Sequence, residues 1–265
     1  MHTRVKTATE LDAMRIGGHM LATILQTLRA ATAPGCTPLD MSALAARELR
    51  ALGGEPAFKG YHGFPDIICI SVNNQVQHSI PSNIQLQAGD VVNYDFGVRY
   101  KGMITDAGIS VGVGGSGATD GSGGADGLGG GLSADAQRLL SGTEAALAAG
   151  VAAISDGVRV GDISAAVEAV LTKHRLGIVR DLVGHGVGHE LHEEPNIPNY
   201  GKAGRGPILK SGMTICVEPI TTLGSYKIME DDDGWTLWTV DGSWSAQFEH
   251  TILVTDDGAE ILTIG

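Results

Sequence analysis

The first third of the chain shows helical and then strand-like patterns of apolar residues. Apolar positions recur at helical spacing over 11–28, directly after a Thr-x-x-Glu capping box at 7–10, and predict a helix that runs to about Ala31. A second helix is predicted from Thr37-Pro38, with proline at its first position, to a stop at Gly53-Gly54. Strand-like runs follow at 67–72, 90–100 and 103–113.

The second half of the chain repeats this order of patterns. Helices are predicted at about 134–154 and 162–175, and strands at around 213–221, 235–239 and 246–254. Between the halves, residues 112–131 are mostly glycine with serine, alanine and aspartate, a composition that buries too little apolar surface to order itself. We therefore expect halves of about 1–111 and 132–265, joined by a Gly-rich insertion at 112–131.

Short motifs in the two halves recur at one common offset. The matching pairs are 61–63 with 184–186, 86–89 with 209–212, and Asp95 with Glu218. One such match could arise by chance, but three at the same offset indicate a duplicated α+β half folded about a pseudo-twofold axis.

Composition narrows the class of protein. A chain of 265 residues is long enough for one large domain, and its formal net charge of −12 argues against a free-standing nucleic-acid binder. The three cysteines form no disulfide or Cys-x-x-Cys zinc pattern, which favours a reducing compartment. No apolar run is long enough for a membrane span or a leader peptide. We therefore expect a soluble cytoplasmic protein with no membrane contact.

A stretch rich in histidine and glutamate, 182–195, is the first candidate for chemistry. It carries glycine at every second position from Gly184 to Gly188, and each of these would cost a helix about 1 kcal/mol. The glycines instead allow a strand or loop to approach another group closely. By itself, the stretch is equally consistent with a Gly-rich loop that carries solvated charges.

Four acidic residues inside strand-like runs supply partners for these histidines. Asp95 and Asp106 lie on two runs joined by a predicted hairpin turn, and Glu218 and Glu249 occupy similar apolar runs in the second half. Each alone could face solvent, but four carboxylates on core strands would repel one another unless cations neutralise them. Together with an imidazole, they form an oxygen-rich set that suits two divalent ions.

The order of motifs resembles the type I methionine aminopeptidases of the pita-bread metallopeptidase fold, in their short bacterial form. The matching motifs are Gly63-Phe64-Pro65, Cys69 to Asn73, His78-x-Ile80-Pro81, Asp95, Asp106, Gly184 to Gly188, His192 to Pro195, Glu218-Pro219 and Ser245 to Thr251. The resemblance implies an α+β fold in which two pseudo-twofold-related halves surround a curved antiparallel sheet. It also implies that residues 1–265 form a single catalytic domain.

The resemblance implies roles for individual residues. Glu218 would act both as a metal ligand and as the group that takes a proton from a hydroxide shared by the two ions. His192 would hydrogen-bond the scissile carbonyl as it becomes an oxyanion, and His78 would hold the substrate backbone and assist the leaving amine. The implied metal ligands are Asp95, Asp106, His185, Glu218 and Glu249.

The resemblance also implies a substrate pocket and a second ion. Tyr61, Phe64, Cys69, Leu191 and Trp235 match the positions that line the pocket for the methionine side chain, with leucine at 191 where bacterial relatives usually carry phenylalanine. Gln77 and Ser79 flank His78 where relatives commonly carry cysteine and glycine. His62, the counterpart of His185, is expected in a structural role or at the rim of the pocket. Asn73 and Ser245 match positions that help to hold a structural monovalent cation in relatives.

The implied activity is metal-dependent removal of the initiator methionine from the N-termini of nascent polypeptides, by a monomer. Co, Mn, Fe and Zn all suit the ligand set, and contact with the ribosome surface near the exit tunnel remains open. An Xaa-Pro aminopeptidase or dipeptidase of the same fold is the nearest alternative. A non-catalytic binding protein of this fold is the other, although such proteins lose metal ligands and all five are present here.

Overall fold

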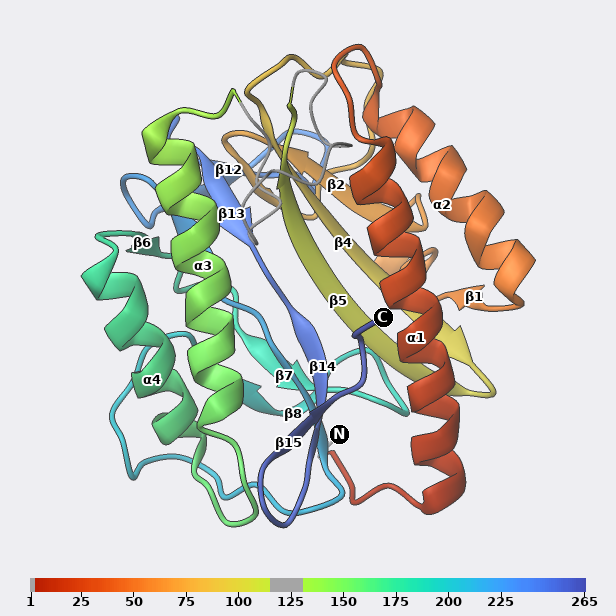
Figure 1. Cartoon of the computed structure of the whole chain (residues 1–265), viewed down its shortest axis with the longest axis vertical. Helices are drawn as coiled ribbons and strands as arrows, with labels where there is room; N and C mark the ends of the chain where they lie inside the picture. Colours follow the sequence, from red (N-terminus) through yellow and green to blue (C-terminus); the bar gives the residue numbers. More distant parts are fainter. Residues whose placement is uncertain (1–2, 115–130) are drawn as a thin grey trace, which may run out of the picture.

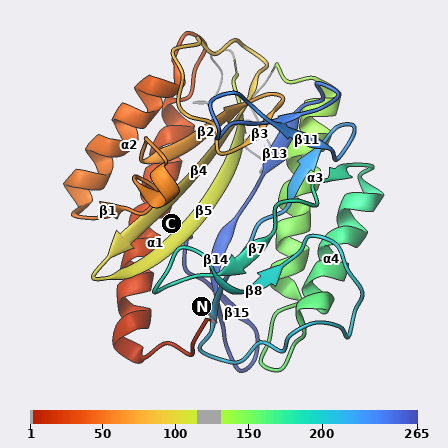
Figure 2. The same ribbon diagram turned by 180° about the vertical axis from the view of Figure 1, so that it is seen from behind.

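Two pairs of helices pack against antiparallel strands in the computed structural model, which describes residues 3–114 and 131–265 (Figure 1). Helices α1 (Ala8–Ala31) and α2 (Pro38–Leu52) belong to the first half, and α3 (Ala134–Ala152) and α4 (Val160–Lys173) belong to the second. Figure 2, seen from behind, shows the strands in front of these helices. No helix in the described ranges is both long and apolar enough to cross a bilayer.

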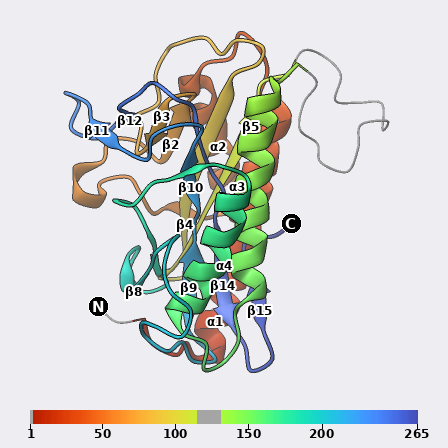
Figure 3. The same cartoon turned by 90° about the vertical axis from the view of Figure 1, so that its left-hand side faces the viewer.

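The strands within the described ranges form four sheets that bring distant parts of the chain together. The first half contributes β1 (Glu55–Pro56), β2 (Ile68–Val72), β3 (Gln75–Gln77), β4 (Val91–Tyr100) and β5 (Met103–Gly112). The second contributes β6 (Gly177–Ile178), β7 (Gly184–Gly186), β8 (Glu193–Ile197), β9 (Thr214–Val217), β10 (Ile220–Thr222), β11 (Ile228–Glu230), β12 (Leu237–Thr239), β13 (Ser245–Gln247), β14 (His250–Val254) and β15 (Ala259–Ile261). The sheet β11-β12-β3 contains strands from both halves, and Figure 3 shows it on the side of the molecule away from α3.

The predicted helices are confirmed, and their ends are capped as the sequence indicated. At the start of α1, the Glu10 carboxylate accepts from the Thr7 N–H at 2.7 Å, and the Thr7 hydroxyl accepts in return from the Glu10 N–H. Thr37 and Asp40 form the same capping box at α2, which ends at Gly53 with a left-handed φ of 81°. The two helices of the first half therefore have well-defined ends.

The predicted hairpin between the first two acidic residues is also confirmed. Strands β4 and β5 pair in register from Val91↔Gly112 to Tyr100↔Met103, and Lys101 and Gly102 form a two-residue turn with positive φ at both positions. Asp95 lies opposite Gly108, two residues from Asp106. Because side chains alternate along a strand, both carboxylates project from the same face of the hairpin.

Two predicted strands are each broken in two, which the sequence analysis missed. The run at 213–221 divides into β9 and β10 around Glu218-Pro219, because Pro219 has no N–H to donate to a ladder. The run at 246–254 divides into β13 and β14, because Glu249 turns to exchange backbone hydrogen bonds with Gly108 of β5. Both breaks fall at acidic residues of the candidate site.

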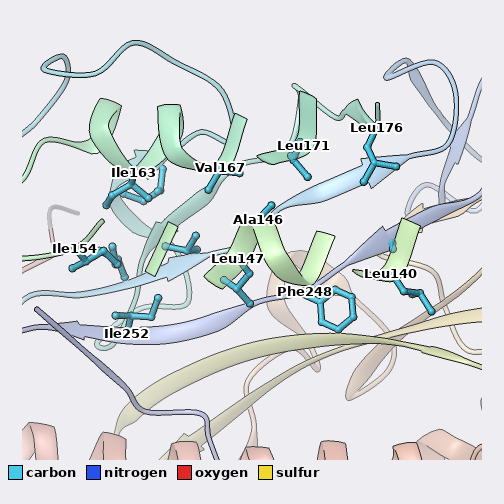
Figure 4. Close-up of a cluster of buried hydrophobic side chains, with 14 of the residues drawn as sticks. Leu140, Ala146, Leu147, Ile154, Ile163, Val167, Leu171, Leu176, Phe248 and Ile252 are labelled. Atoms are coloured by element: carbon cyan, nitrogen blue, oxygen red, sulfur yellow. The ribbon is translucent and has the colours of Figure 1, made fainter. Parts of the chain in front are cut away.

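Separate hydrophobic cores support the two halves. In the second half, α3 and α4 pack on β14 and its neighbours through side chains that include Leu147, Ile163 and Ile252 (Figure 4). Phe248 joins this core directly before Glu249, so the backbone at that carboxylate is fixed by packing (Figure 4). The first core, beneath α1 and α2, contains Tyr94 and Phe96 on either side of Asp95.

The ends of the predicted insertion lie close together. Most of the segment, 115–130, falls outside the described residues, but Gly112 and Leu132 are in contact: a Cβ at Gly112 would lie 2.4 Å from Leu132 Cδ1. Val113 is tied to Asp90 by a 2.7 Å backbone hydrogen bond. The connection between the halves therefore begins and ends at one point.

Replacing 115–130 by a short Gly-Ser linker is expected to leave activity and folding nearly unchanged. The flanking backbone is anchored on both sides, and shortening a loop between fixed ends changes its closure free energy by only about 0.6 kcal/mol per halving of length. The measurement is kcat/KM on a Met-initiated peptide together with the melting temperature. A large loss of either would show that the segment contributes to the fold or to the site.

Candidate active site

One cavity of about 260 Å³ gathers the chemically active residues of both halves. The carboxylates and His185 come from the hairpin β4–β5, from β7, and from the breaks after β9 and before β14. Figure 2 shows β4, β5, β7 and β14 side by side. Every residue predicted to act as metal ligand, catalytic group or pocket wall lines the cavity: Asp95, Asp106, His185, Glu218, Glu249, His78, His192, Tyr61, Phe64, Cys69, Leu191 and Trp235.

The four carboxylates are buried without compensating cationic side chains in the described part of the protein. Asp95, Asp106, Glu218 and Glu249 are each less than 8 % exposed. One oxygen each of Asp95, Asp106 and Glu249 is buried without a hydrogen-bond partner among the described residues. Buried oxygens that lack partners are rare in folded proteins, because each forfeits its hydration. These atoms are therefore suited to an external cation.

Burial raises the pKa of all four acids, and repulsion from neighbouring carboxylates adds to the shift at Asp95, Glu218 and Glu249. Burial raises the pKa of Asp106 to about 7. Burial and the neighbouring charge of Asp106 raise the pKa of Asp95 well above its ordinary value, and Glu218 and Glu249 shift in the same direction for the same reasons. A divalent ion would reverse these shifts by favouring the ionised form.

Without metal, the ionised form of these buried acids is expected to lower the free energy of unfolding. A carboxyl group whose folded pKa lies near 7 and whose unfolded pKa lies near 3.9 destabilises the fold increasingly as pH rises between the two values. Metal-free Asp106→Asn should therefore gain stability over metal-free wild type from pH 4 to pH 7, by up to about 4 kcal/mol. The buried histidines titrate in both proteins, and Asp106 also raises the pKa of Asp95, Glu218 and Glu249, so the difference between the two proteins measures the relief of the whole acid cluster. Denaturant unfolding at several pH values measures it, and a constant difference would contradict the assignment.

His185 has the tautomer that a metal ligand needs. Its Nδ1 lies 2.9 Å from the Gly186 carbonyl oxygen, which can only accept, so Nδ1 carries the proton and Nε2 keeps its lone pair. Nε2 lies 3.5 Å from Glu218 Oε1. Burial and the neighbouring His192 lower the pKa of His185 to about 3, so the ring is neutral. An imidazole lone pair thus points towards the carboxylates.

The potential ligand atoms converge closely enough to hold a metal ion. One ligand atom each from Asp106, His185, Glu249 and Cys216 lies within 4.8 Å of the others. The sequence analysis missed Cys216, although its position two residues before Glu218 on β9 was a usable signal. Its Sγ lies 3.6 Å from Thr251 Oγ1, and burial raises the pKa of this thiol well above its ordinary value. The donor set of carboxylates and imidazole fits divalent cations.

The other two histidines of the site lie next to this cluster. The His192 ring lies 4.3 Å from the His185 ring, between centroids, and its Nδ1 lies 2.8 Å from the Tyr61 hydroxyl. Burial and the nearby His78 and His62 lower the pKa of His192 to about 4. Burial also lowers the pKa of His78, which sits after β3 with a left-handed φ of 57°. Both rings are therefore neutral near pH 7 and can exchange hydrogen bonds with a substrate.

An apolar wall completes the cavity beside the charged cluster. The rings of Phe64 and Trp235 meet edge to face with centroids 5.1 Å apart, and Cys69 and Leu191 are buried next to them. Phe58, His62 and Gln77 also line the cavity. His62 had been expected in a structural role or at the rim. Phe58 had not been identified, because an aromatic residue in that position is typical of the hydrophobic core.

A polar network behind the carboxylates was not identified from the sequence. Gln247 Nε2 donates to Glu249 Oε2 at 3.0 Å, while its Oε1 accepts from Asn93 at 3.0 Å. A Cβ at Gly108 would lie 2.7 Å from Gln247 Oε1, so only glycine admits this close approach. These contacts fix the orientation of one carboxylate, and they could not be inferred because Asn93 and Gln247 are 154 residues apart.

Asn73 and Ser245 lie outside the lining of this cavity. The Asn73 side chain donates to Asp90 at 2.9 Å and accepts from the Val91 N–H, while the Asn73 carbonyl accepts from the Ser245 N–H. The Ser245 hydroxyl is buried without a partner in the described ranges. A monovalent cation at these two residues stays a prediction.

Comparison with known proteins identifies the family. The model of metallopeptidase family M24 matches residues 12–256. The chain belongs to metallopeptidase family M24. It is 40 % identical over 267 residues to methionine aminopeptidase 1 of Mycobacterium tuberculosis (98 % of this chain, 94 % of the relative). It is 37 % identical over 260 residues to methionine aminopeptidase of Clostridium perfringens, covering 98 % of each.

The crystal structure of methionine aminopeptidase from Thermotoga maritima is similar to this M24 peptidase throughout. The TM-score is 0.92 at 38 % identity, covering 99 % of this chain and 100 % of the other. The resemblance to the bacterial methionine aminopeptidases and the prediction of an α+β pita-bread fold are thereby confirmed. The roles assigned to individual residues stay predictions.

Proposed function

We propose that this M24 peptidase removes methionine from the N-termini of newly made polypeptides in the cytoplasm. The observation that carries this proposal is the convergence of four buried carboxylates and a neutral imidazole beside an apolar pocket. Residues 1–265 act as one catalytic domain whose halves, 1–111 and 132–265, both contribute to the site. We propose that the chain acts as a monomer.

Asp95, Asp106, His185, Glu218 and Glu249 hold two divalent ions of Co, Mn, Fe or Zn. These ions would activate water near neutral pH and polarise the scissile carbonyl. The free N-terminal amine of a peptide would supply a lone-pair ligand to one of these ions, which a peptide nitrogen within a chain does not. Removal of one residue from an N-terminus is therefore the reaction that this site supports.

The protein groups complete the reaction around the scissile bond. Glu218, 3.5 Å from His185, accepts the proton from the attacking water. His192 is oriented by the Tyr61 hydroxyl at Nδ1, which leaves Nε2 to hydrogen-bond the carbonyl oxygen as it gains negative charge. His78 binds the backbone of the second residue and assists departure of the new amine. None of these groups requires a side chain from outside the cavity.

The apolar wall selects the side chain that is removed. An unbranched thioether packs well against aromatic rings and sulfur, which Phe64, Trp235 and Cys69 provide. Tyr61 and Leu191 close the remaining sides. Leucine at 191 is smaller than phenylalanine, so we expect the pocket to accept bulkier or longer apolar side chains than one closed by an aromatic residue.

The test is hydrolysis of a peptide panel by protein loaded separately with each metal. Release of methionine from Met-Ala-Ser, with no cleavage of Ala-Pro or Gly-Pro peptides, is the expected result. The reverse preference would establish the Xaa-Pro alternative. Metal binding without cleavage of any peptide would favour the non-catalytic alternative.

A further inference from the structure

A buried ion pair ties the start of the chain to the loop that carries His192. Lys6 Nζ lies 3.2 Å from Glu193 Oε2, and the two side chains are 0 % and 1 % exposed. Glu193 belongs to the stretch at 182–195 that is, by its sequence alone, equally consistent with solvated charges, but its side chain is buried. A buried ion pair stabilises only when its remaining donors and acceptors are satisfied, so the full set of contacts decides its role.

All three protons of the Lys6 ammonium group have acceptors. Besides Glu193, Nζ donates to Thr3 Oγ1 at 2.9 Å and to the Arg4 carbonyl at 3.2 Å. Thr3 is anchored in turn, because its hydroxyl donates to the Thr214 carbonyl and its N–H to the Glu194 carbonyl. Figures 1 and 2 both place the start of the chain beside β8. The arm is therefore docked through several specific contacts.

The Glu193 carboxylate uses its other oxygen to close the loop. Oε1 accepts from the backbone N–H of His189 at 2.8 Å and of Glu190 at 3.1 Å. Leu191 and His192 lie between these amides and Glu193 itself, so a single carboxylate holds both ends of the segment that presents them. Charge-assisted hydrogen bonds of this kind are stronger than neutral ones.

The position of the Lys6 side chain explains why residue 188 is a glycine. Gly188 has a φ of +144°, and a Cβ there would lie 2.4 Å from Lys6 Cε. Any larger residue would displace the ammonium from Glu193. Outside the ion pair, the His189 imidazole contacts Glu10 Oε1 at 2.7 Å, which adds a second link between the N-terminal segment and the loop.

We infer that Thr3, Lys6 and Glu193, here called the N-terminal clamp, are positioning residues that hold the loop at 188–193 so that His192 and Leu191 face the cavity. The inference rests on the proposed function only for its effect on rate; the geometry of the loop is independent of the reaction. Because a displacement of about 1 Å of a catalytic group lowers rates by up to roughly a hundredfold, a loosened clamp reduces kcat.

Lys6→Met is the direct test, with Arg4→Met as a matched control. Methionine keeps an unbranched apolar stem and removes the charge, while the exposed Arg4 lies in the same arm. In Lys6→Met we expect kcat on a Met-Ala peptide to fall about tenfold or more, with KM and bound metal per chain little changed. Arg4→Met should match wild type in all three.

Histidine NMR separates positioning from general destabilisation. Among the nine histidines, the His192 resonances, assigned with His192→Gln, should shift or broaden in Lys6→Met while those of His185 keep their positions. The double variant Lys6→Met/Glu193→Gln should recover part of kcat and of the His192 signal. Its glutamine oxygen still accepts from the two amides, and no buried charge is left unpaired.

The outcomes are distinguishable. If Lys6→Met fails to fold, Thr3→Val provides a milder change that removes one anchor of the ammonium, and the same readouts apply. Unchanged kcat and His192 resonances in a folded variant would overturn the inference, as would equal changes at all histidines. If wild type fails to release methionine, the proposed function is wrong, and the His192 resonances still test the clamp.

Discussion

Replacing Asp106 by asparagine, or Glu249 by glutamine, is expected to abolish tight metal binding and to lower kcat/KM about a thousandfold or more. Each change removes a carboxylate whose second oxygen is buried without a partner among the described residues. The loss of several kcal/mol of transition-state stabilisation from the ions accounts for the magnitude, since about 1.4 kcal/mol corresponds to a tenfold change in rate.

The measurements are metal content after dialysis against a dilute metal buffer and kcat/KM on a Met-initiated peptide. Asp90→Asn is a matched control, because Asp90 is an acidic residue outside the cavity lining. It should retain metal and rate, although an asparagine can accept only one of the two hydrogen bonds that the Asp90 carboxylate accepts, from the Asn73 side chain and the Gln87 N–H, and so loses some stability. Normal metal stoichiometry in Asp106→Asn and Glu249→Gln would remove these residues from the metal centre.

His192→Ala is expected to keep the fold and the bound metal but to lose about a hundred- to a thousandfold in kcat, the usual loss for one oxyanion donor. KM should change much less, because the hydrogen bond strengthens as the carbonyl oxygen gains charge. The distance of 2.8 Å from Tyr61 to Nδ1 predicts that Tyr61→Phe shows a smaller loss in the same direction.

His19→Ala is the control for this second experiment, since His19 is an exposed histidine on α1. It should match wild type in rate and in metal content. A His192→Ala protein with full activity would exclude His192 from the mechanism. One that loses its metal would make His192 part of the metal centre instead.

The helices, the β4–β5 hairpin and the placement of the acids could be predicted because their signals are local. Capping boxes, a two-residue turn and apolar alternation each act within a few residues, so Asp95 and Asp106 were correctly placed on one hairpin. The offset between the halves then indicated Glu218 as the counterpart of Asp95. The resemblance to a known family added the roles expected for the histidines.

What could not be predicted depends on contacts between distant segments. The break at Glu249 results from a backbone bridge to Gly108, and the burial of Glu193 results from a lysine 187 residues away. Neither partner leaves a pattern in the residues around it. Gln247 was missed for the same reason, because in isolation it looks like an ordinary strand residue.

The candidate metal centre has a mechanical role as well as a chemical one, because its ligands come from both halves. Asp95 and Asp106 belong to one half, and His185, Glu218 and Glu249 belong to the other, so any ion bound among them is a cross-link between the halves, in addition to the hydrophobic cluster that they share. Such a cross-link adds stability that grows with the logarithm of the free metal concentration, about 4 kcal/mol at a thousandfold excess of metal over its Kd. Removal of the metal by a chelator would therefore lower the activity and the free energy of unfolding together.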